Sequence, residues 1–451
     1  MKTEIFLIRK LVNTHYLLVL LLLFVGLVFT KPAHAQAWTL QQCIDTAQVH
    51  NKNLQISRNN MEMSSQKQLE ARAYLIPKVS LNGDYKYFVD LPYQFMPQSA
   101  FGGPEGEYKE IQMGVPHNIN ANLQVAIPIY NPQVYGVIQS TKTAMELSKL
   151  QHKKTEEQVY FEVSNLYYNA QIIIHQKAFI DSNLINTAKL LKTVQLLNEQ
   201  LMAKETDVQK VALQLEQLTT QQQLAVNNLD QVMNALKFSM GIPFDQLIDI
   251  VSDIQYHVKP LYPSSLFVDL QLAGTQNKLL TTELKMLKNS RLPSVSLYGS
   301  YGQNGYGYDQ NPDEFLKFYP TSFAGIQISY PLFNGTVTKR KINQKKIEIQ
   351  NSELQIALVS DQNTMLVMNA KSRRIISQKN IENTAGQLEL AANLYQQLML
   401  QQKEGMATLT DVLMADNELR QVQQMYLSMV VDYLKADLEL KKLTGNISIT
   451  K

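Results

Sequence analysis

Hydrophobic and polar residues alternate strictly along two stretches of the chain, and each stretch leads into a long helical segment. The apolar positions are Ile119, Ala121, Leu123, Val125 and Ile127 in the first stretch, and Ala324, Ile326, Ile328 and Tyr330 in the second. Strict alternation predicts a β-strand with one apolar and one polar face. A proline-containing turn follows each strand, and then come roughly 70 residues of helical character, about 105 Å at 1.5 Å per residue. A strand joined to so long a helix is not typical of a globular domain.

Two further alternating stretches complete the pattern, and each follows a proline. Val79, Leu81, Gly83 and Tyr85 come after Pro77, and Val295, Leu297, Gly299 and Tyr301 come after Pro293 at the same spacing. Roughly ten residues of alternation suffice for a strand to cross a bilayer as part of a barrel. The segments 91–117 and 304–320, which separate the strands of each pair, are predicted to be loops.

The order of these elements repeats, so we interpret the chain as an internal duplication. The first repeat covers residues 36–241 with a β-hairpin over 77–130, and the second covers 264–445 with a β-hairpin over 293–331. A linker, 242–263, separates the repeats, and a tail, 446–451, follows the second. Each repeat is expected to contain one helix of roughly 70 residues and two of roughly 35.

The predicted helices of the first repeat cover 39–74, 133–204 and about 207–240. In the second repeat they cover about 265–292, the segment after Gly335 to a break near Gly405, and about 409–444. Leu190, Val194, Leu197 and Leu201 have the alternating spacing of a coiled-coil seam. Two short helices end to end match one long helix, so we expect each long helix to pack beside a stacked short pair.

The N-terminus has the pattern of a secretory signal peptide over residues 1–35. Basic residues precede an apolar run from Tyr16 to Phe29, and Ala33-His34-Ala35 provides a cleavage site. The alternative, a membrane anchor, requires a longer apolar run of roughly 20 residues. Since no later stretch has the pattern of a membrane-spanning helix, any membrane embedding is expected to involve strands.

Composition excludes several classes of function. The net charge of +3 gives no electrostatic argument for nucleic-acid binding. Cys43 is the only cysteine, so we interpret it as a small packing residue rather than half of an internal disulfide. The seven histidines and 17 methionines are scattered without ligand spacing, and the chain has no glycine-rich phosphate loop and no nucleophile elbow. We therefore expect no enzyme activity, no cofactor and no metal site.

Four strands cannot close a barrel alone, and open strand edges in lipid leave backbone groups unpaired at several kcal/mol each. Two copies would give eight strands and a barrel filled by its own side chains, whereas three copies give twelve strands with room for an aqueous lumen. The predicted fold class is an α+β membrane protein with an internal two-fold repeat. A homotrimer shares a transmembrane β-barrel, four strands per chain, and a long α-helical coiled-coil barrel.

The chain resembles the TolC-type outer-membrane efflux proteins over essentially its whole mature length. The resemblance rests on Trp38-Thr-Leu-Gln-Gln-Cys43 and on the helix–proline–strand units at Pro77 and Pro293. It also rests on two further pairs of motifs, Pro128-Ile-Tyr-Asn131 with Pro331-Leu-Phe-Asn-Gly335, and Thr206-Asp-Val-Gln209 with Gly405-Met-Ala-Thr-Leu-Thr-Asp411. Each motif is weak alone, but the ordered set occurs twice.

The resemblance implies a trimeric outer-membrane channel that extends across the periplasm. It implies a periplasmic adaptor (membrane fusion) protein, an inner-membrane transporter and outer-membrane lipid as partners, in a tripartite system that exports substrates. Two other classes were considered. A periplasmic adaptor would carry one helical hairpin in a β-rich domain, and a structural coiled-coil envelope protein would need no amphipathic strands of bilayer length.

The candidate site residues fall into two groups. The resemblance places Asp411 in an acidic ring at the periplasmic mouth, with Asp207 and Gly405 at the corresponding helical breaks, although Thr408 and Asp411 also form a capping-box pattern. A second acid and a basic latch residue of the family pattern are replaced by Met414 and Ala407. The polar strand positions expected to line the barrel lumen are Asn82, Asp84, Asn120, Asn122, Gln124 and Gln327.

Two surface patterns have alternative explanations. Aromatic residues gather near the strands, either as membrane girdles or as stacked core rings of a soluble sheet. They are Tyr85, Tyr87, Phe88, Tyr130, Tyr301, Tyr319, Phe323, Tyr330 and Phe333. The basic run Lys339-Arg-Lys341 with Lys345-Lys346 follows the last strand, and it either contacts anionic lipid headgroups or forms a solvated helix face.

Overall fold

The computed structural model describes residues 37–254, 262–263, 267–307 and 317–447. The predicted signal peptide and part of the linker lie outside these residues. The described residues form two compact units, and each unit takes segments from both halves of the chain. One unit contains residues up to Gln55, between Glu156 and Ser264, and from Val367 onward; the other contains Ile56–Thr155 and Ser265–Leu366.

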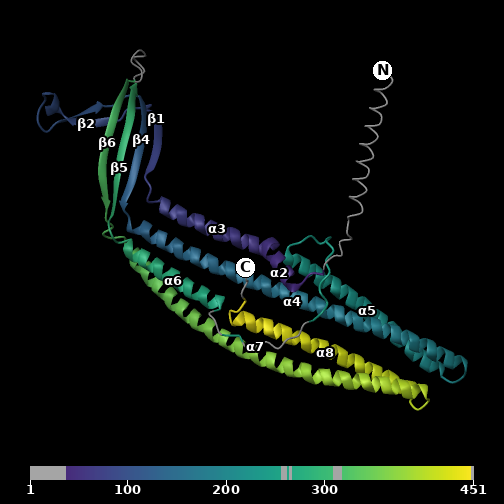
Figure 1. Ribbon diagram of the computed structural model, residues 1–451. Helices are drawn as coiled ribbons and strands as arrows, with labels where there is room; N and C mark the ends of the chain where they lie inside the picture. The colour runs from purple at the N-terminus through teal and green to yellow at the C-terminus, as the bar shows by residue number, and fades with distance from the viewer. Residues whose placement is uncertain (1–36, 255–261, 264–266, 308–316, 448–451) are drawn as a thin grey trace, which may run out of the picture. The chain divides into compact units, whose positions relative to one another are not determined.

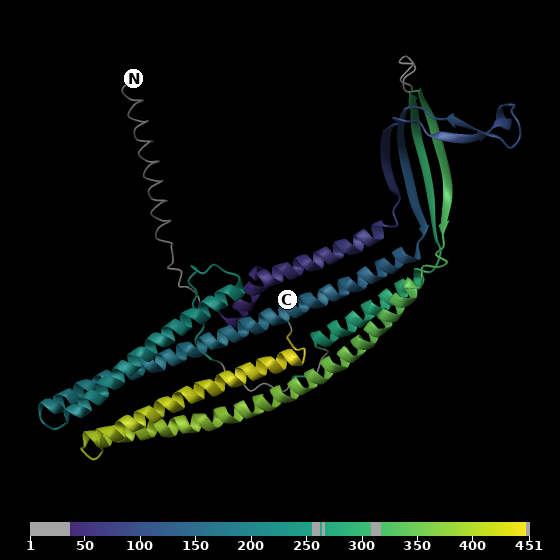
Figure 2. The ribbon, with the colours of Figure 1, turned by 180° about the vertical axis from the view of Figure 1, so that it is seen from behind.

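The second of these units contains an antiparallel sheet of four strands in the order β1-β4-β5-β6. Its strands are β1 (Lys78–Tyr87), β4 (His117–Tyr130), β5 (Ser294–Gly307) and β6 (Lys317–Ser329). The views from front and back both place β1 and β6 at the two edges (Figure 1, Figure 2). The four alternating stretches therefore form strands as predicted, and the sheet has two unpaired edges within the described chain.

Segment 91–117, predicted to be a loop, contains a hairpin instead. β2 (Tyr93–Pro97) pairs with β3 (Tyr108–Gln112), and the short 3-10 helix η1 (Gln98–Phe101) lies between them. The prolines of this segment led to the wrong prediction, since proline is uncommon inside strands. Pro97, however, occupies the last paired position of β2, where a missing N–H costs least. The predicted loop 304–320 is also too long, since β5 and β6 extend into both of its ends.

Four helices reach into the same unit. They are α3 (Lys52–Ala73), α6 (Val268–Asn289) and the first parts of α4 (Pro132–Glu199) and α7 (Val337–Lys403). Ion pairs join α6 to both long helices, with Lys278 Nζ 2.7 Å from Glu146 of α4 and Lys345 Nζ of α7 2.9 Å from Glu283. The long helices contain 68 and 67 residues, which confirms the lengths predicted from the sequence.

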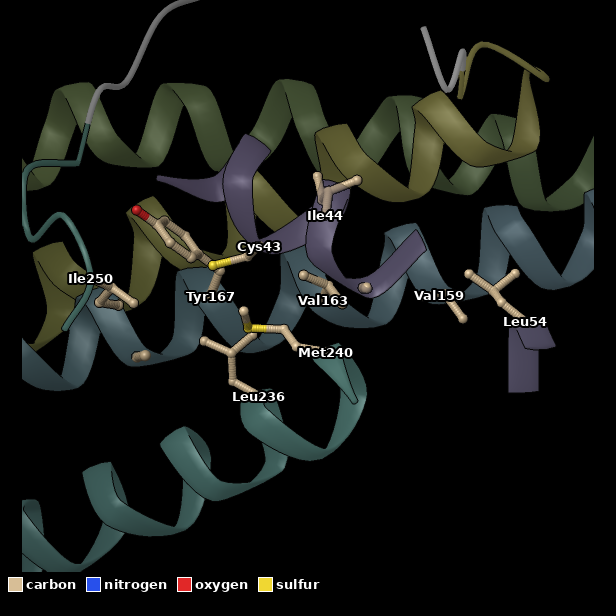
Figure 3. Close-up of a cluster of buried hydrophobic side chains, with 11 residues drawn as sticks. Cys43, Ile44, Leu54, Val159, Val163, Tyr167, Leu236, Met240 and Ile250 are labelled. Carbon is tan, nitrogen blue, oxygen red and sulfur yellow. The ribbon is translucent and has the colours of Figure 1, made fainter. Parts of the chain in front are cut away.

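The other unit contains α2 (Leu40–His50), α5 (Glu205–Met240), α8 (Leu409–Leu443) and the remaining parts of α4 and α7. Figure 3 shows its main core, in which α2 packs against α4 and α5. The fully buried members include Cys43, Val163, Leu236 and Met240. Cys43 is confirmed as a packing residue, and burial raises the pKa of its thiol to about 12.

The predicted single helix over 39–74 is wrong, because the chain bends at Asn51. Asn51 has an extended backbone (φ −61°, ψ 126°), and its side-chain oxygen accepts from the N–H of Leu54, which caps α3. Its amide also donates to the carbonyl of Ser239 at the end of α5, over 2.7 Å. This tertiary contact stabilises the break, and a periodicity argument cannot detect it.

The linker pairs with the segment that precedes α2. Trp38 forms a parallel bridge with Ile250, and the Trp38 N–H donates to the carbonyl of Asp249 over 2.8 Å. The side chain of Gln171 on α4 donates to the carbonyls of Val251 and Asp253. Part of the linker thus lies along α4, where its backbone carbonyls accept hydrogen bonds from a side chain of that helix. Within the described ranges, no helix is both long enough and apolar enough to span a membrane.

Candidate functional site

Most polar residues of the four strands lie on one face of the sheet. The register pairs Asn82 with Asn122, and Asp84 with Asn120. Asn120 pairs in turn with Asn304 of β5. Directly paired residues of antiparallel strands point to the same side. The predicted lumen residues Asn82, Asp84, Asn120, Asn122 and Gln124 therefore share a face, and the register of Gln327 opposite Ser296 places it on the same face.

Side-chain hydrogen bonds join these residues into an amide ladder made of Asn82, Asn122, Asn120, Asn304 and Thr321. Asn82 donates to Asn122, and Asn122 donates to Asn120. Asn120 donates to Asn304 over 2.7 Å, and Asn304 donates to the Thr321 hydroxyl over 3.0 Å. The ladder crosses every strand of the sheet. It gives the polar face a fixed row of hydrogen-bonding groups.

A glycine makes room for this ladder. Gly302 of β5 lies between Asn122 of β4 and Thr321 of β6 in the register. A Cβ atom at Gly302 would lie 2.7 Å from both the Ala121 carbonyl oxygen and the Asn122 Cβ. The close approach of the strands at this position therefore requires glycine.

The aromatic residues divide between the two faces. Tyr85 and Tyr301 pair with Ile119 and Leu123 on the apolar face. Tyr319 and Phe323 pair with Asn304 and Ser300 on the polar face, so they do not lie on the same face as Tyr85 and Tyr301.

The register explains this outcome, because a two-residue period fixes the side of every residue along β6. The ring of Tyr298 contacts Phe323 edge to face at 5.9 Å on the polar face. It also lies over Gly325, where a Cβ atom would come within 3.1 Å of the ring.

The turn between α4 and α5 contains a residue in an uncommon conformation. Leu201 has a positive φ of 60°, and its side chain is 94% exposed. The N–H of Met202 donates to the carbonyl of Leu197 over 2.8 Å, and the N–H of Leu201 donates to that of Asn198 over 2.9 Å. These are the two bonds of a Schellman motif. The prediction that Leu201 continues the coiled-coil seam is wrong, because α4 ends at Glu199.

The turn between α7 and α8 has the same geometry with glycine in the left-handed position. Gly405 has φ 73°, and the N–H groups of Gly405 and Met406 donate to the carbonyls of Gln402 and Gln401. Gly405 and Leu201 are separated by the same number of residues as Asp411 and Asp207, so they occupy equivalent positions in the two repeats. The two repeats therefore use one turn with different residues at its most demanding position.

Asp411 caps α8 together with Thr408. The Thr408 N–H donates to Asp411 Oδ2 over 2.9 Å, and the Asp411 N–H donates to the Thr408 hydroxyl oxygen over 3.2 Å. Hydrogen bonds from the Thr408 side chain and backbone lower the pKa of Asp411. Asp411 is exposed and therefore carries a negative charge at neutral pH. The capping box predicted at this position is confirmed.

Asp207 has the corresponding place at the start of α5, with a weaker cap. It accepts from the N–H of Lys204 over 3.4 Å, and the ammonium group of Lys210 lies 3.7 Å from its carboxylate. α5 begins two residues before Asp207, at Glu205, so Asp207 lies in its first turn. Lys204 stands where the second repeat has Thr408, and it has no hydroxyl to accept from a backbone N–H.

A buried polar network near these turns escaped the sequence analysis. Asp416 of α8 accepts from Gln214 of α5 over 2.8 Å and from the guanidinium of Arg420. Arg420 also donates to Thr187 of α4 over 3.3 Å. Burial raises the pKa of Asp416, and Arg420 opposes that shift. The four-residue spacing of Asp416 and Arg420 could have indicated an ion pair, but the partners on α4 and α5 are distant in sequence.

Comparisons with known proteins agree with this geometry. The family model described as outer membrane efflux protein matches residues 269–446. The outer membrane protein TolC of Salmonella enteritidis is 19% identical over 92% of this chain and 83% of that protein.

Two solved structures have a similar fold. The outer membrane protein VceC of Vibrio cholerae has a TM-score of 0.73 at 14% identity, covering 90% of this chain and 96% of that one. The open state of the MtrE outer membrane channel of Neisseria gonorrhoeae also has a TM-score of 0.73, at 17% identity, covering 90% of this chain and 88% of that one. The fold is thus that of outer-membrane channels.

Proposed function

Because the chain belongs to the TolC-type outer-membrane efflux protein family, we propose that three copies form the exit duct of a tripartite export system. The protein is an outer-membrane efflux channel that extends into the periplasm. Family and fold are those of channel proteins rather than enzymes. In the proposed system, a periplasmic adaptor connects the trimer to an inner-membrane transporter, which supplies the energy for export.

The observation that carries the proposal is the open sheet. β1 and β6 are edge strands within the described chain, and their apolar faces carry exposed residues such as Leu81 and Ile326. Unpaired edges in lipid cost several kcal/mol for each backbone group. Pairing β1 of one copy with β6 of the next removes both edges. Three copies give a closed barrel of twelve strands, which is wide enough for an aqueous lumen.

In this assembly the amide ladder faces the lumen, and the apolar face meets lipid. Asn82, Asn120 and Asn122 would line the exit with neutral hydrogen-bonding groups. Asp84 lies 3.1 Å from the ammonium group of Lys86, so that pair contributes little net charge. We infer that the exit selects weakly by charge. It would therefore pass whatever the inner-membrane transporter delivers.

The helical turns would form the periplasmic mouth. Asp411, exposed and ionised, would form a ring of three carboxylates that attracts cations. Gly405 fixes the turn that precedes it, and Asp207 occupies the corresponding place at the start of α5. Because Ala407 and Met414 replace the basic latch residue and the second acid of the family pattern, the closed mouth would depend on other contacts, such as the Asp416 network.

Conductance of the purified protein in a planar bilayer tests the proposal. A stable trimer should conduct, and a divalent cation added on the mouth side should block the wild type more strongly than Asp411→Asn. The block should persist from pH 8 down to pH 5, because the lowered pKa keeps Asp411 ionised, and it should fade only as the pH drops below the ordinary pKa of an aspartate carboxyl. Asp84→Asn, which removes a carboxylate from the sheet, is the matched control.

The outcomes separate the two parts of the proposal. A correctly assembled trimer that never conducts, even after its mouth contacts are weakened by Gln214→Ala, would contradict the channel. A conducting trimer whose block is the same in the wild type and in Asp411→Asn would keep the channel and assign Asp411 to helix capping alone.

A further inference from the structure

A hollow of about 310 Å³ lies at the joint where β6 ends and α7 begins. Three segments line it, namely the end of α6, the connecting strap 330–336, and the first turn of α7. All three segments belong to the same compact unit. Figure 1 shows this joint below the sheet, where the green strand passes into the green helix.

The lining of the hollow is cationic and rich in donors. Arg291, two residues after the end of α6, and Lys339 of α7 supply the positive charges. Hydroxyl and amide groups complete the polar part of the lining, from Ser290, Asn334, Thr336 and Thr338. Its ten residues, all in the described part of the chain, include no carboxylate. Guanidinium, ammonium and hydroxyl donors around one space are the groups that bind phosphate oxygens.

The charge around the hollow is also positive. Five of the first ten residues of α7 are Lys or Arg, and none of those ten is acidic. Glu348 is the first acidic residue of α7, and Glu283 of α6 contacts the same part of that helix. Both carboxylates pair with Lys345. Arg291 and Lys339 thus lie in a region where neighbouring carboxylates are already neutralised. An anion would be attracted to it.

An apolar border adjoins this positive region. Leu332 and Phe333 of the strap are 84% and 83% exposed, and Tyr330 is exposed beside them. The apolar face of β6 leads to this border through Ile326 and Ile328, which are also exposed. Positive charges next to an exposed apolar band with an aromatic residue are typical of a membrane–water interface.

The corresponding joint of the first repeat is different. There β4 passes into α4 through Asn131 alone, and the Asn131 side chain caps the helix by accepting from the N–H groups of Gln133 and Val134. In the second repeat the amide of Asn334 donates to the Thr338 hydroxyl. Two consecutive residues, Gly335 and Thr336, have positive φ values of 65° and 70°. The longer strap of the second repeat therefore creates a concave surface. The first repeat has no corresponding segment and so has no such surface at this joint.

We propose that this hollow binds the phosphate of an anionic phospholipid headgroup at the periplasmic face of the outer membrane. Arg291 and Lys339 bind the phosphate oxygens, and the hydroxyl groups of the lining donate to those that remain. Tyr330, Leu332 and Phe333 contact the glycerol and the first part of the acyl chains. The lipid source rests on the proposed function, which puts the apolar face of the sheet in the bilayer.

Calorimetric titration of the purified assembly in non-ionic detergent tests the proposal. The probes are dihexanoyl phosphatidylglycerol, inorganic phosphate, and dihexanoylglycerol, which has the same chains without phosphate. The double variant Arg291→Gln, Lys339→Gln should bind the phospholipid at least about tenfold more weakly than the wild type. The matched control is Arg340→Gln, Lys341→Gln, which loses the same charge from residues outside the lining and should bind like the wild type. Arg291→Lys, Lys339→Arg should retain most of the affinity.

Three results would overturn the proposal. The first is equal weakening in both glutamine variants, which would indicate general electrostatic attraction. The second is equal affinity for inorganic phosphate and phospholipid, which would indicate a free-phosphate site. The third is no binding of the phospholipid by the wild type.

Each variant is also assayed for trimer formation and conductance, which should remain at wild-type levels. A conducting assembly without lipid binding rejects this inference alone, whereas a wild-type protein that never conducts rejects the proposed function.

Discussion

Gly241 allows α5 to end directly against the bend between α2 and α3, and its substitution by alanine provides a sharp test of the structure. Gly241 has φ 74°, and its N–H donates to the carbonyl of Phe238. A Cβ atom at this position would lie 2.2 Å from the carbonyl oxygen of His50 and 2.9 Å from the backbone nitrogen of Asn51. These contacts are to backbone atoms, which cannot rotate away.

Two costs add in Gly241→Ala. The left-handed conformation costs an alanine about 1 kcal/mol. Relieving the collision also requires α5 to move away from His50, and overpacking of this kind costs about 1–3 kcal/mol. The same movement would stretch the hydrogen bond from Asn51 to Ser239. We therefore expect a total loss of about 2–4 kcal/mol.

Gly405→Ala is the matched control. Gly405 has nearly the same φ, 73°, but a Cβ atom there would meet nothing within 4 Å. It should lose only the conformational cost of about 1 kcal/mol. Hydrogen exchange measures both effects, through the amides of Asn51 and Leu54 for Gly241→Ala and those of Gly405 and Met406 for its control. Equal losses in the two variants, or no faster exchange around Asn51 in Gly241→Ala, would refute the packing argument.

Three further predictions concern the compact unit that contains α2, α5 and α8. Leu201→Gly should stabilise the α4–α5 turn by up to about 1 kcal/mol, because the exposed Leu201 gains nothing from its left-handed position; unchanged or faster hydrogen exchange at Met202 would contradict this. Lys177 and Gln222 lower the pKa of Asp181, so Asp181→Asn should reduce the urea midpoint at pH 7, and the difference should disappear as the pH falls through the lowered pKa; a difference that persists at pH 2 would be evidence against it. Arg374→Met should cost about 3–5 kcal/mol, because it leaves Asp437 buried without the guanidinium 2.9 Å away, and Arg374→Met with Asp437→Leu should recover most of that loss in the same urea assay.

The strands and long helices were predictable because they depend on patterns that are local in sequence. Alternation over 118–129 and 322–330 reports which face of a strand is apolar, and the register of β4 and β6 agrees with it. The absence of proline over roughly 70 residues similarly predicted the extents of α4 and α7. In both cases the residues of the segment itself are sufficient to predict its secondary structure.

The errors arose where contacts distant in sequence decide the local structure. Asn51 fits a helix by pattern, but its contact with Ser239 stabilises a bend. The Asp416 network was missed for a related reason, since only the fold brings Gln214 and Thr187 to the same acid. Tyr319 and Phe323 were assigned by residue type, although the parity of β6 places them opposite to Tyr301.

The two repeats share a topology, so the positions at which they differ are the best guide to function. The turn before α8 combines a glycine in the left-handed position with two capping hydrogen bonds between Thr408 and Asp411. The turn before α5 has Leu201 in that position, and the Asn198 side chain donates to the Ala203 carbonyl over 2.9 Å within it. At the start of α5, Asp207 accepts from the Lys204 N–H over 3.4 Å, without a hydroxyl partner such as Thr408. The cap of α5 is therefore weaker than that of α8, and the start of α5 depends more on packing against neighbouring helices. A mouth that opens when such packing is exchanged for a partner would loosen first at the α4–α5 turn, while the α7–α8 turn keeps Asp411 in place.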